Sequence, residues 1–228
     1  DVPCIETSDS EKLCRHPVVS VLMATYNHES YIRQAIEGVM MQKADFEFEL
    51  IIGEDCSPDK TREICFEYQK KYPDKIRVLW WHENVSKLGG NGERMRARCR
   101  GEFIAICEGD DFWTDPDKLQ KQVAVFRKYP TVNLCFGGVD ILYQRTGVVR
   151  KYLDHASRVS GVVKGSDMVR YGLGIEPSVR LNTSFHNAQT SGLMVRTTDY
   201  LRSIDEDEVF TWRLLLGDKT LRLALAGR

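Results

Sequence analysis

The sequence lacks several features that would place it in a specialised class of protein. Its seven cysteines are scattered and never spaced as Cys-x-x-Cys, which argues against a disulfide framework and a structural zinc site. No apolar run approaches the roughly 20 residues of a membrane span, and the first residues have no signal-peptide character. We therefore expect a protein of the reducing cytoplasm.

An excess of charge of one sign is also missing. The formal net charge is -1 over 228 residues, so the chain as a whole gives no reason to expect nucleic acid as a partner. The length suits one large domain with a proper hydrophobic core. Any anionic ligand must therefore be bound by local groups.

What the sequence does contain is an alternation of strand and helix. Four buried apolar runs, at 18–24, 48–52, 75–84 and 102–111, alternate with helical patterns at 28–42, 61–73 and 91–101. Short connections between such elements predict an α/β fold with a mostly parallel, doubly wound sheet and helices on both faces. In such sheets ligands bind beyond the carboxyl ends of the strands.

The pattern loosens after a predicted helix at 115–130. Strands are expected at 131–143 and 147–153, and a short helix near 165–173. Residues 190–201 are expected to form a strand that enters a helix. Residues 205–218 are expected to form a helix with an acidic first turn, which the helix dipole favours.

Two adjacent carboxylates, Asp110 and Asp111, directly follow the fourth apolar run. Paired carboxylates raise each other's pKa unless a cation neutralises them, and oxygen ligands suit Mg²⁺ or Mn²⁺. The alternative is that one of the two caps the next helix, which is expected to begin near Asp115. Glu108, just upstream, is expected to be a bystander.

Polar residues also follow the first two predicted strands. Asp55 could accept a hydrogen bond from a nucleobase N–H or belong to a turn, for which Asp59 is the better candidate. Tyr26 could stack on a base, and Asn27 could simply begin the loop. Glycines before a helix that carries Arg94 could bring main-chain amides and one arginine to phosphate, but no Gly-Lys-Ser/Thr follows, so this is not a P-loop.

The acids at 205–208 allow two interpretations. They could complement the dipole of the helix that they begin, or one of them could be a general base held over a reaction site. The residues alone favour the first interpretation.

Taken in order, these clusters resemble the GT-A glycosyltransferases, specifically the inverting enzymes of family 2. The stretch "VSVLMATYN" resembles the opening strand of that family, "ELIIGEDCSPDKT" its DDGSxDxT turn, and "AICEGDDFWTDPDKLQKQV" its acidic metal motif and following helix. "TSGLMVRTTDYL" is similar to its acceptor-side segment, and "DEDEVFTWRL" to its ED-x-(D/E)-L-x-x-R helix. The resemblance covers residues 18–130 closely.

The resemblance implies a role for each candidate residue. Asp207, six residues before Arg213, would be the catalytic base, and Asp111 the metal ligand, with Asp110 beside it on the ribose or the metal. The remaining nucleotide-binding candidates are Thr25, Tyr26, Asn27, Asp55 and Arg94. The implied cofactor is Mg²⁺ or Mn²⁺. Glu54 and Cys56 depart from the more usual Asp and Gly around Asp55, which leaves the choice of donor open.

The resemblance also implies a division of the chain and a reaction. Residues 1–16 are polar and unpatterned and are expected to form an arm. The resemblance assigns 17–130 to the nucleotide-sugar-binding half and 131–228 to the acceptor-binding and catalytic-base half of one GT-A domain. The sugar would pass from a nucleoside-diphosphate sugar, expected to be a UDP-sugar, to a saccharide or lipid-linked acceptor in bacterial surface-polysaccharide biosynthesis. The place of the reaction would be the cytoplasm, and a peripheral contact with the inner membrane through a tail beyond this sequence stays open.

Two other functions fit part of the pattern. A non-catalytic module that binds nucleotide sugars or polysaccharide would use Asp207 only at a helix start. A sugar nucleotidyltransferase shares the broad sheet architecture, but it would need a glycine-rich, basic loop after the first strand, where this chain has "ATYNHESY".

Overall fold

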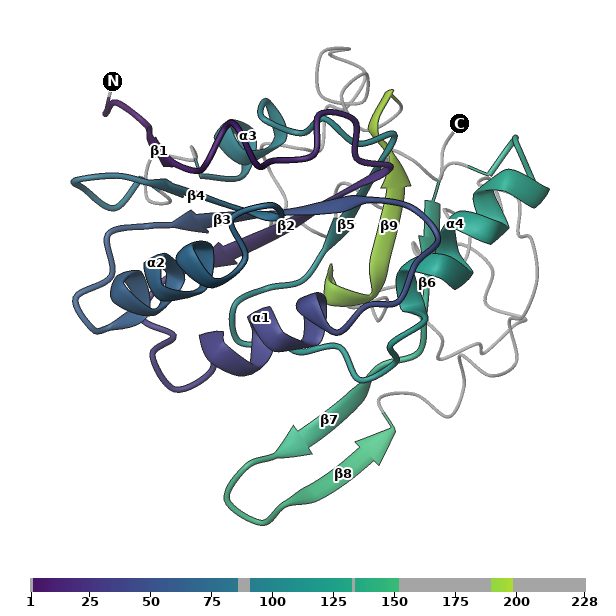
Figure 1. Ribbon diagram of the computed structural model, residues 1–228. Coiled ribbons are helices and arrows are strands. Elements are labelled where there is room, and N and C mark those ends of the chain that lie inside the picture. The colour runs from purple at the N-terminus through teal and green to yellow at the C-terminus, as the bar shows by residue number, and fades with distance from the viewer. Residues whose placement is uncertain (1, 86–90, 133, 152–189, 199–228) are drawn as a thin grey trace, which may run out of the picture.

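A seven-stranded sheet organises the described part of the chain (Figure 1). The structure is a computed structural model, and it describes residues 2–85, 91–132, 134–151 and 190–198. Four neighbouring strands run parallel: β4 (Ile76–Trp80), β3 (Phe48–Glu54), β2 (Val19–Thr25) and β5 (Phe103–Ile106). The mostly parallel α/β sheet that the sequence predicts is thus confirmed.

Antiparallel strands extend this parallel centre on both sides. β1 (Ile5–Thr7) pairs with β4, while β9 (Leu193–Arg196) lies between β5 and β6 (Leu134–Phe136). β9 comes from far along the chain, and Met194 and Val195 are both fully buried. The segment at 190–198 is therefore an integral part of the sheet.

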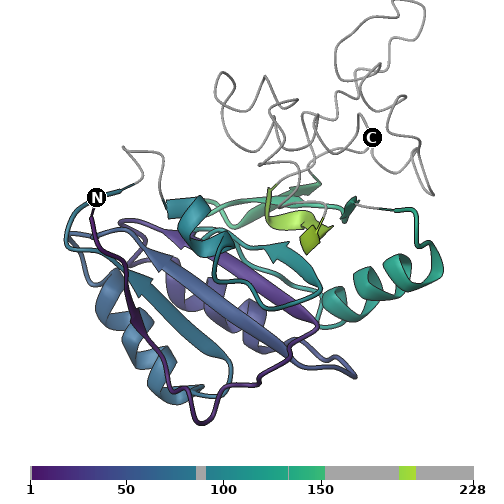
Figure 2. The same ribbon diagram turned by 90° about the horizontal axis from the view of Figure 1, so that it is seen from above.

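Helices cover both faces of the sheet, as predicted (Figure 2). α1 (Ile32–Met40), α2 (Thr61–Lys71) and α4 (Lys118–Lys128) bury their apolar sides in one large cluster with alternate residues of the central strands. α3 (Asn91–Arg96) packs on the opposite face, where Met95 joins a smaller cluster with Leu22, Ile51 and Leu79. The alternation of strand side chains between two faces explains why the central strands are apolar throughout.

The predicted N-terminal arm contains a strand that the sequence pattern did not indicate. Glu6 in β1 accepts hydrogen bonds from the Arg77 guanidinium in β4 at 2.9 and 3.1 Å, and from Arg98 at 3.2 Å. An edge strand is held mainly by its main-chain ladder, and here a long-range ion pair adds to it. Residues 5–7 thus cover the outer edge of β4.

The second half agrees with the prediction only in part. The strand expected at 131–143 is two strands, β6 and β7 (Asp140–Tyr143), with Gly137 and Gly138 between them. β7 pairs with β8 (Val148–Lys151) in a separate hairpin, which projects from the body in Figure 1. A short 3-10 turn, η4 (Thr190–Gly192), precedes β9. The helices expected near 165–173 and at 205–218 lie outside the described residues.

None of the helices in the described part of the chain combines the length and the apolar character needed to span a membrane.

Candidate functional site

The polar segments that follow β2, β3 and β5 meet at the carboxyl edge of the sheet. The main-chain N–H of Asp55 donates to the Thr25 carbonyl at 3.1 Å, and that of Gly109 donates to the Ala24 carbonyl at 2.9 Å. Because β2 lies between β3 and β5, the loop after β2 is joined directly to the loops on both sides. The polar residues that follow these three strands therefore lie together at one edge of the sheet.

Asp55 is fixed by the segment that follows β4. Its side chain is fully buried, and its Oδ1 accepts a hydrogen bond from the Val85 N–H at 2.7 Å. The Asn84 side-chain amide donates to the Asp55 carbonyl at 3.2 Å. The carboxylate therefore has one defined orientation, while its contact with a nucleobase stays a prediction.

Glu54, which departs from the family pattern, belongs to a buried ion pair. It has no exposed surface and accepts hydrogen bonds from the Ser57 N–H at 2.7 Å and the Arg62 Nε at 2.5 Å. Arg62 also donates to the Trp81 carbonyl at 2.7 Å and lies over the Trp80 ring. A buried carboxylate needs such partners to offset its desolvation. The pair ties the turn after β3 to the end of β4, a contact that sequence reasoning missed.

Two residues at this edge have a left-handed backbone without being glycine. Asn27 and Cys56 both have φ of 59°, and each lies just beyond the end of its strand, β2 or β3. Asn tolerates this region, but Cys rarely adopts it. Backbone strain of this kind tends to occur at functional sites, where surrounding contacts impose it. Here the Asn27 N–H donates to Ser57 Oγ at 3.0 Å, which joins the two left-handed turns.

His28 connects the loop after β2 to the carboxylate pair. Thr25 is buried, and its Oγ1 lies 3.2 Å from His28 Nδ1, while His28 Nε2 lies 3.9 Å from Asp110 Oδ2. Gly109 packs so closely here that a Cβ on it would lie 2.6 Å from Thr25 Oγ1. The sequence signalled no role for His28, because its position depends on a contact across the strands. Tyr26, by contrast, is 43% exposed, as a stacking surface requires.

Asp110 and Asp111 both present carboxylates to solvent. The Asp110 side chain is 53% exposed, and Asp111 is also exposed. The alternative that one of them caps the next helix is wrong, since α4 begins at Lys118 after Asp117, far from either residue. Asp111 Oδ2 instead accepts a hydrogen bond from Ser191 Oγ at 2.7 Å.

This carboxylate pair fits a hard divalent cation that takes its other ligands from elsewhere. Among the described residues, no group of three or more His, Cys, Asp or Glu side chains is arranged to hold a metal ion. Mg²⁺ commonly uses one or two carboxylates together with substrate phosphates and water. Asp110 and Asp111 supply two carboxylates at an exposed edge. The metal itself stays a prediction.

Of the other two sequence candidates, one lies on α3 and the other lies outside the described residues. Arg94, on α3, donates to the Val2 carbonyl at 2.8 Å and lies over the Trp81 ring. Its predicted contact with phosphate is not tested by these contacts. Asp207 lies outside the described residues, and its role as the base stays a prediction.

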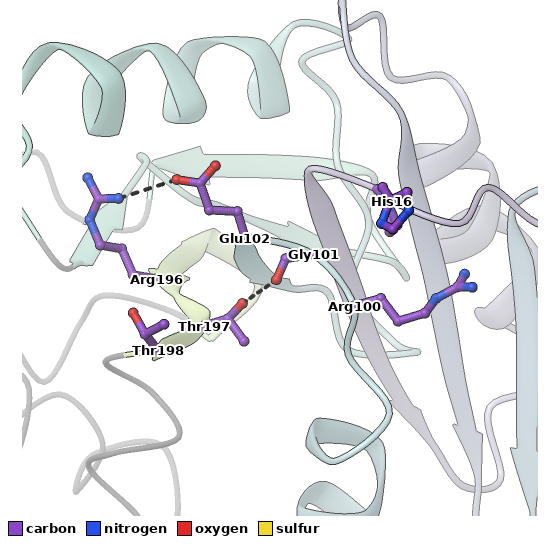
Figure 3. A pocket seen from close by; sticks show the side chains of 8 residues that line it. His16, Arg100, Gly101, Glu102, Arg196, Thr197 and Thr198 are labelled. Carbon is purple, nitrogen blue, oxygen red and sulfur yellow. Dashed lines mark hydrogen bonds and ion pairs between the residues drawn. The ribbon is translucent and has the colours of Figure 1, made fainter.

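A pocket of about 520 Å³ lies at the opposite edge of the sheet (Figure 3). Its walls come from the residues before β2 and β5 and from the end of β9 with the residues after it, and include His16, Arg100, Glu102 and Arg196. Arg100 is paired with the buried Glu49 at 2.6 Å, and Arg196 donates to main-chain carbonyls of Phe126 and Val132. The side chains of Arg100 and Arg196 therefore already make hydrogen bonds and ion pairs that hold the fold together.

The protein is a doubly wound α/β sheet with polar residues gathered at the carboxyl edge. Ligands bind at that edge in sheets of this kind. The sequence model of the family described as "Glycosyl transferase family 2" matches residues 20–169. The chain therefore belongs to glycosyl transferase family 2.

Individual relatives agree with this assignment. An uncharacterized protein of Mycobacterium tuberculosis is 39% identical over 126 residues, which cover 55% of this chain and 36% of that protein. TuaG of Bacillus subtilis, provisionally named a teichuronic acid biosynthesis glycosyltransferase, is 31% identical over 137 residues, covering 60% of this chain and 52% of that protein. The chain thus spans between about a third and a half of the length of these relatives.

The crystal structure of residues 1–349 of S. aureus TarS in complex with UDP has a similar fold. The TM-score is 0.54 at 21% identity, with 91% of this chain and 53% of that chain covered. This likeness supports the GT-A type of sheet that the sequence resemblance implied.

Proposed function

We propose that this chain carries the donor site of an inverting glycosyltransferase, which moves a sugar from a nucleoside-diphosphate sugar to a saccharide or lipid-linked acceptor. The observation that carries the proposal is the junction of the segments around Thr25, Asp55 and Asp110 at the carboxyl edge of parallel strands. Nucleotides bind at this edge in doubly wound sheets. Membership of glycosyl transferase family 2 supplies the chemistry.

The residues that follow β2, β3 and β5 each have a proposed part in binding the donor. Asp55, Tyr26 and Thr25 take the base, with Asn27 in the same loop, and Asp110 takes the ribose or the metal. We take UDP as the first nucleotide to test because TarS, a protein of similar fold, binds it. The provisional name of TuaG supports surface-polysaccharide synthesis as the setting. Arg94 is proposed to reach the diphosphate.

The proposed reaction is a single displacement. The Asp207 carboxylate takes the proton of an acceptor hydroxyl, whose oxygen attacks the anomeric carbon from the face opposite the leaving nucleoside diphosphate. The new glycosidic C–O bond forms as the C–O bond to the diphosphate breaks, so the configuration is inverted. A bound Mg²⁺ or Mn²⁺ supplies Lewis-acid stabilisation of the charge on the departing diphosphate. Asp111, with Asp110 beside it, would hold that ion.

A thermal-shift screen of nucleoside diphosphates tests the donor site. UDP, GDP, ADP, CDP and dTDP are each added with Mn²⁺ or with EDTA. The nucleotide that fits should raise the unfolding temperature with Mn²⁺ and lose most of that effect with EDTA, because stabilisation follows the ratio of ligand to Kd. If none of them stabilises the protein under either condition, the donor site is refuted.

A variant pair tests the proposed base. Asp207→Asn should still bind the nucleoside diphosphate with Mn²⁺ but lose sugar transfer, whereas Asp205→Asn, a matched change two residues away in the sequence, should keep it. Transfer is measured as nucleoside diphosphate released in the presence of acceptor. Normal transfer by Asp207→Asn would refute the base assignment. Binding without transfer by the wild-type protein, across a panel of donors and acceptors, would favour a non-catalytic binding module.

A further inference from the structure

We propose that Ser191 is a positioning residue, which orients the Asp111 carboxylate for a divalent cation. Its hydroxyl donates to Asp111 Oδ2 at 2.7 Å. Within the described residues this is the only hydrogen bond or ion pair of that carboxylate. The inference rests on the proposed function, since it concerns the same metal site.

The hydroxyl proton of Ser191 has a defined direction. The Glu108 N–H donates to Ser191 Oγ at 2.9 Å and thereby occupies the acceptor side of the hydroxyl. The proton is then directed to Asp111. A hydrogen bond between a hydroxyl and a carboxylate is stronger than one between neutral groups. An exposed aspartate would otherwise sample several rotamers, so the bond selects one orientation in advance of cation binding.

The main chain at Ser191 and Gly192 is fixed by two hydrogen bonds and by the strand that follows. The buried Trp113 indole N–H donates to the Ser191 carbonyl at 2.7 Å, and the Gln122 side chain from α4 donates to the next carbonyl, of Gly192, at 3.0 Å. Directly after these residues the chain enters β9, whose residues Leu193 to Val195 are fully buried in the sheet. A side chain whose main chain is held in this way can fix the position of a more exposed partner.

Ser20, in β2, makes a similar bond that serves the structure of the sheet. Ser20 Oγ donates to Glu49 Oε1 at 2.7 Å, and it accepts from the N–H groups of Arg100 and Gly101. Glu49 is only 1% exposed and is neutralised by Arg77 and Arg100, so this bond stabilises the fold at the far edge. Asp111 is exposed, so its bond with Ser191 is not needed to offset the burial of a carboxylate. The Ser20–Glu49 bond therefore stabilises a buried charge, whereas the Ser191–Asp111 bond orients an exposed one.

The test compares Ser191→Ala with Ser20→Ala as its matched control. Mn²⁺ binding is measured from the loss of the free-ion signal in electron paramagnetic resonance, with and without UDP, and folding from the thermal unfolding temperature. Ser191→Ala should weaken Mn²⁺ binding about 10- to 100-fold, the usual effect of losing an outer partner of a ligand. Ser20→Ala should lower the unfolding temperature while the affinity for Mn²⁺ stays that of the wild type. Ser191→Thr, which keeps the hydroxyl, should restore most of the affinity.

The outcomes separate this inference from the proposed function. Unchanged Mn²⁺ affinity in Ser191→Ala, while Asp111→Asn abolishes binding, would overturn the positioning role and leave the metal site standing. No Mn²⁺ binding by the wild-type protein, with or without UDP, would overturn both. If Ser191→Ala fails to fold, Ser191→Cys replaces it, because a thiol has similar size but donates weakly. Full Mn²⁺ affinity in that variant would equally refute the inference.

Discussion

At the scale of single residues, the left-handed Cys56 stands out at the candidate site. Its φ of 59° is a conformation that costs an L-residue roughly 1 to 2 kcal/mol and that glycine adopts freely. The position is one where the family resemblance leads us to expect glycine. The left-handed backbone after β3 would suit glycine, and this chain has a strained cysteine there instead.

A pair of variants isolates that strain. Cys56→Gly and Cys56→Ala both remove the hydrogen bond from Sγ to the His82 carbonyl, so they differ only in backbone freedom and one methyl group. We expect Cys56→Gly to be more stable than Cys56→Ala by roughly 1 kcal/mol, as measured by urea unfolding. An alanine variant as stable as the glycine variant would mean that the turn relaxes without cost.

Residue chemistry at the site was predictable where the sequence carried a local signal. Asp110 and Asp111 were recognisable because two acids directly follow a buried run, and they do lie at the sheet edge. His28 and Ser191 were not, since each gains its place from a partner distant in sequence or on another loop. A lone histidine or serine has no spacing pattern, and only the fold brings Ser191 to Asp111.

At the scale of elements, β1 shows the limit of pattern reading. Its three residues, Ile5 to Thr7, have no periodicity that would distinguish a strand from an irregular arm. The central strands were predictable because burial on both faces demands continuous apolar runs. β1 depends instead on main-chain pairing with β4 and on the ion pair between Glu6 and Arg77, neither of which leaves a local signal.

The Glu6–Arg77 pair predicts an acid-dependent attachment of β1. Burial alone would raise the pKa of Glu6, but the hydrogen bond and charge of Arg77 outweigh it and hold the pKa below its ordinary value of 4.5. A carboxyl whose pKa is lower in the folded state adds stability above about 4.5, and this is lost as pH falls through the lowered pKa. We expect Glu6→Gln to cost about 1 to 2 kcal/mol at pH 7, and less toward pH 3.

Urea unfolding of both proteins between pH 7 and pH 3 measures this difference. Glu11→Gln, an exposed change on the same segment, is the control and should leave stability unchanged across the range. A difference between the wild type and Glu6→Gln that stays constant with pH would show that ionisation of Glu6 is not what holds β1 on the sheet.

At the scale of the whole molecule, one sheet separates two apolar clusters of unequal size. The larger cluster lies under α1, α2 and α4, and the smaller lies under α3. Every central strand contributes to both, because successive side chains point to opposite faces. Loss of either cluster should therefore unfold the same strands, so we expect the described body to unfold as one cooperative unit.

Two adjacent isoleucines of β3 test this expectation with matched chemistry. Ile51 belongs to the smaller cluster and Ile52 to the larger, and both have no exposed surface. Ile51→Ala and Ile52→Ala should each lower the free energy of unfolding by about 2 to 5 kcal/mol. Both should shift one single transition, seen at the same urea concentration by tryptophan fluorescence and by circular dichroism. If Ile51→Ala instead produced a separate early transition in fluorescence, the α3 face would unfold independently. Binding of the donor nucleotide would then be expected to stabilise that face first, because Asp55 is fixed by the segment that leads into α3.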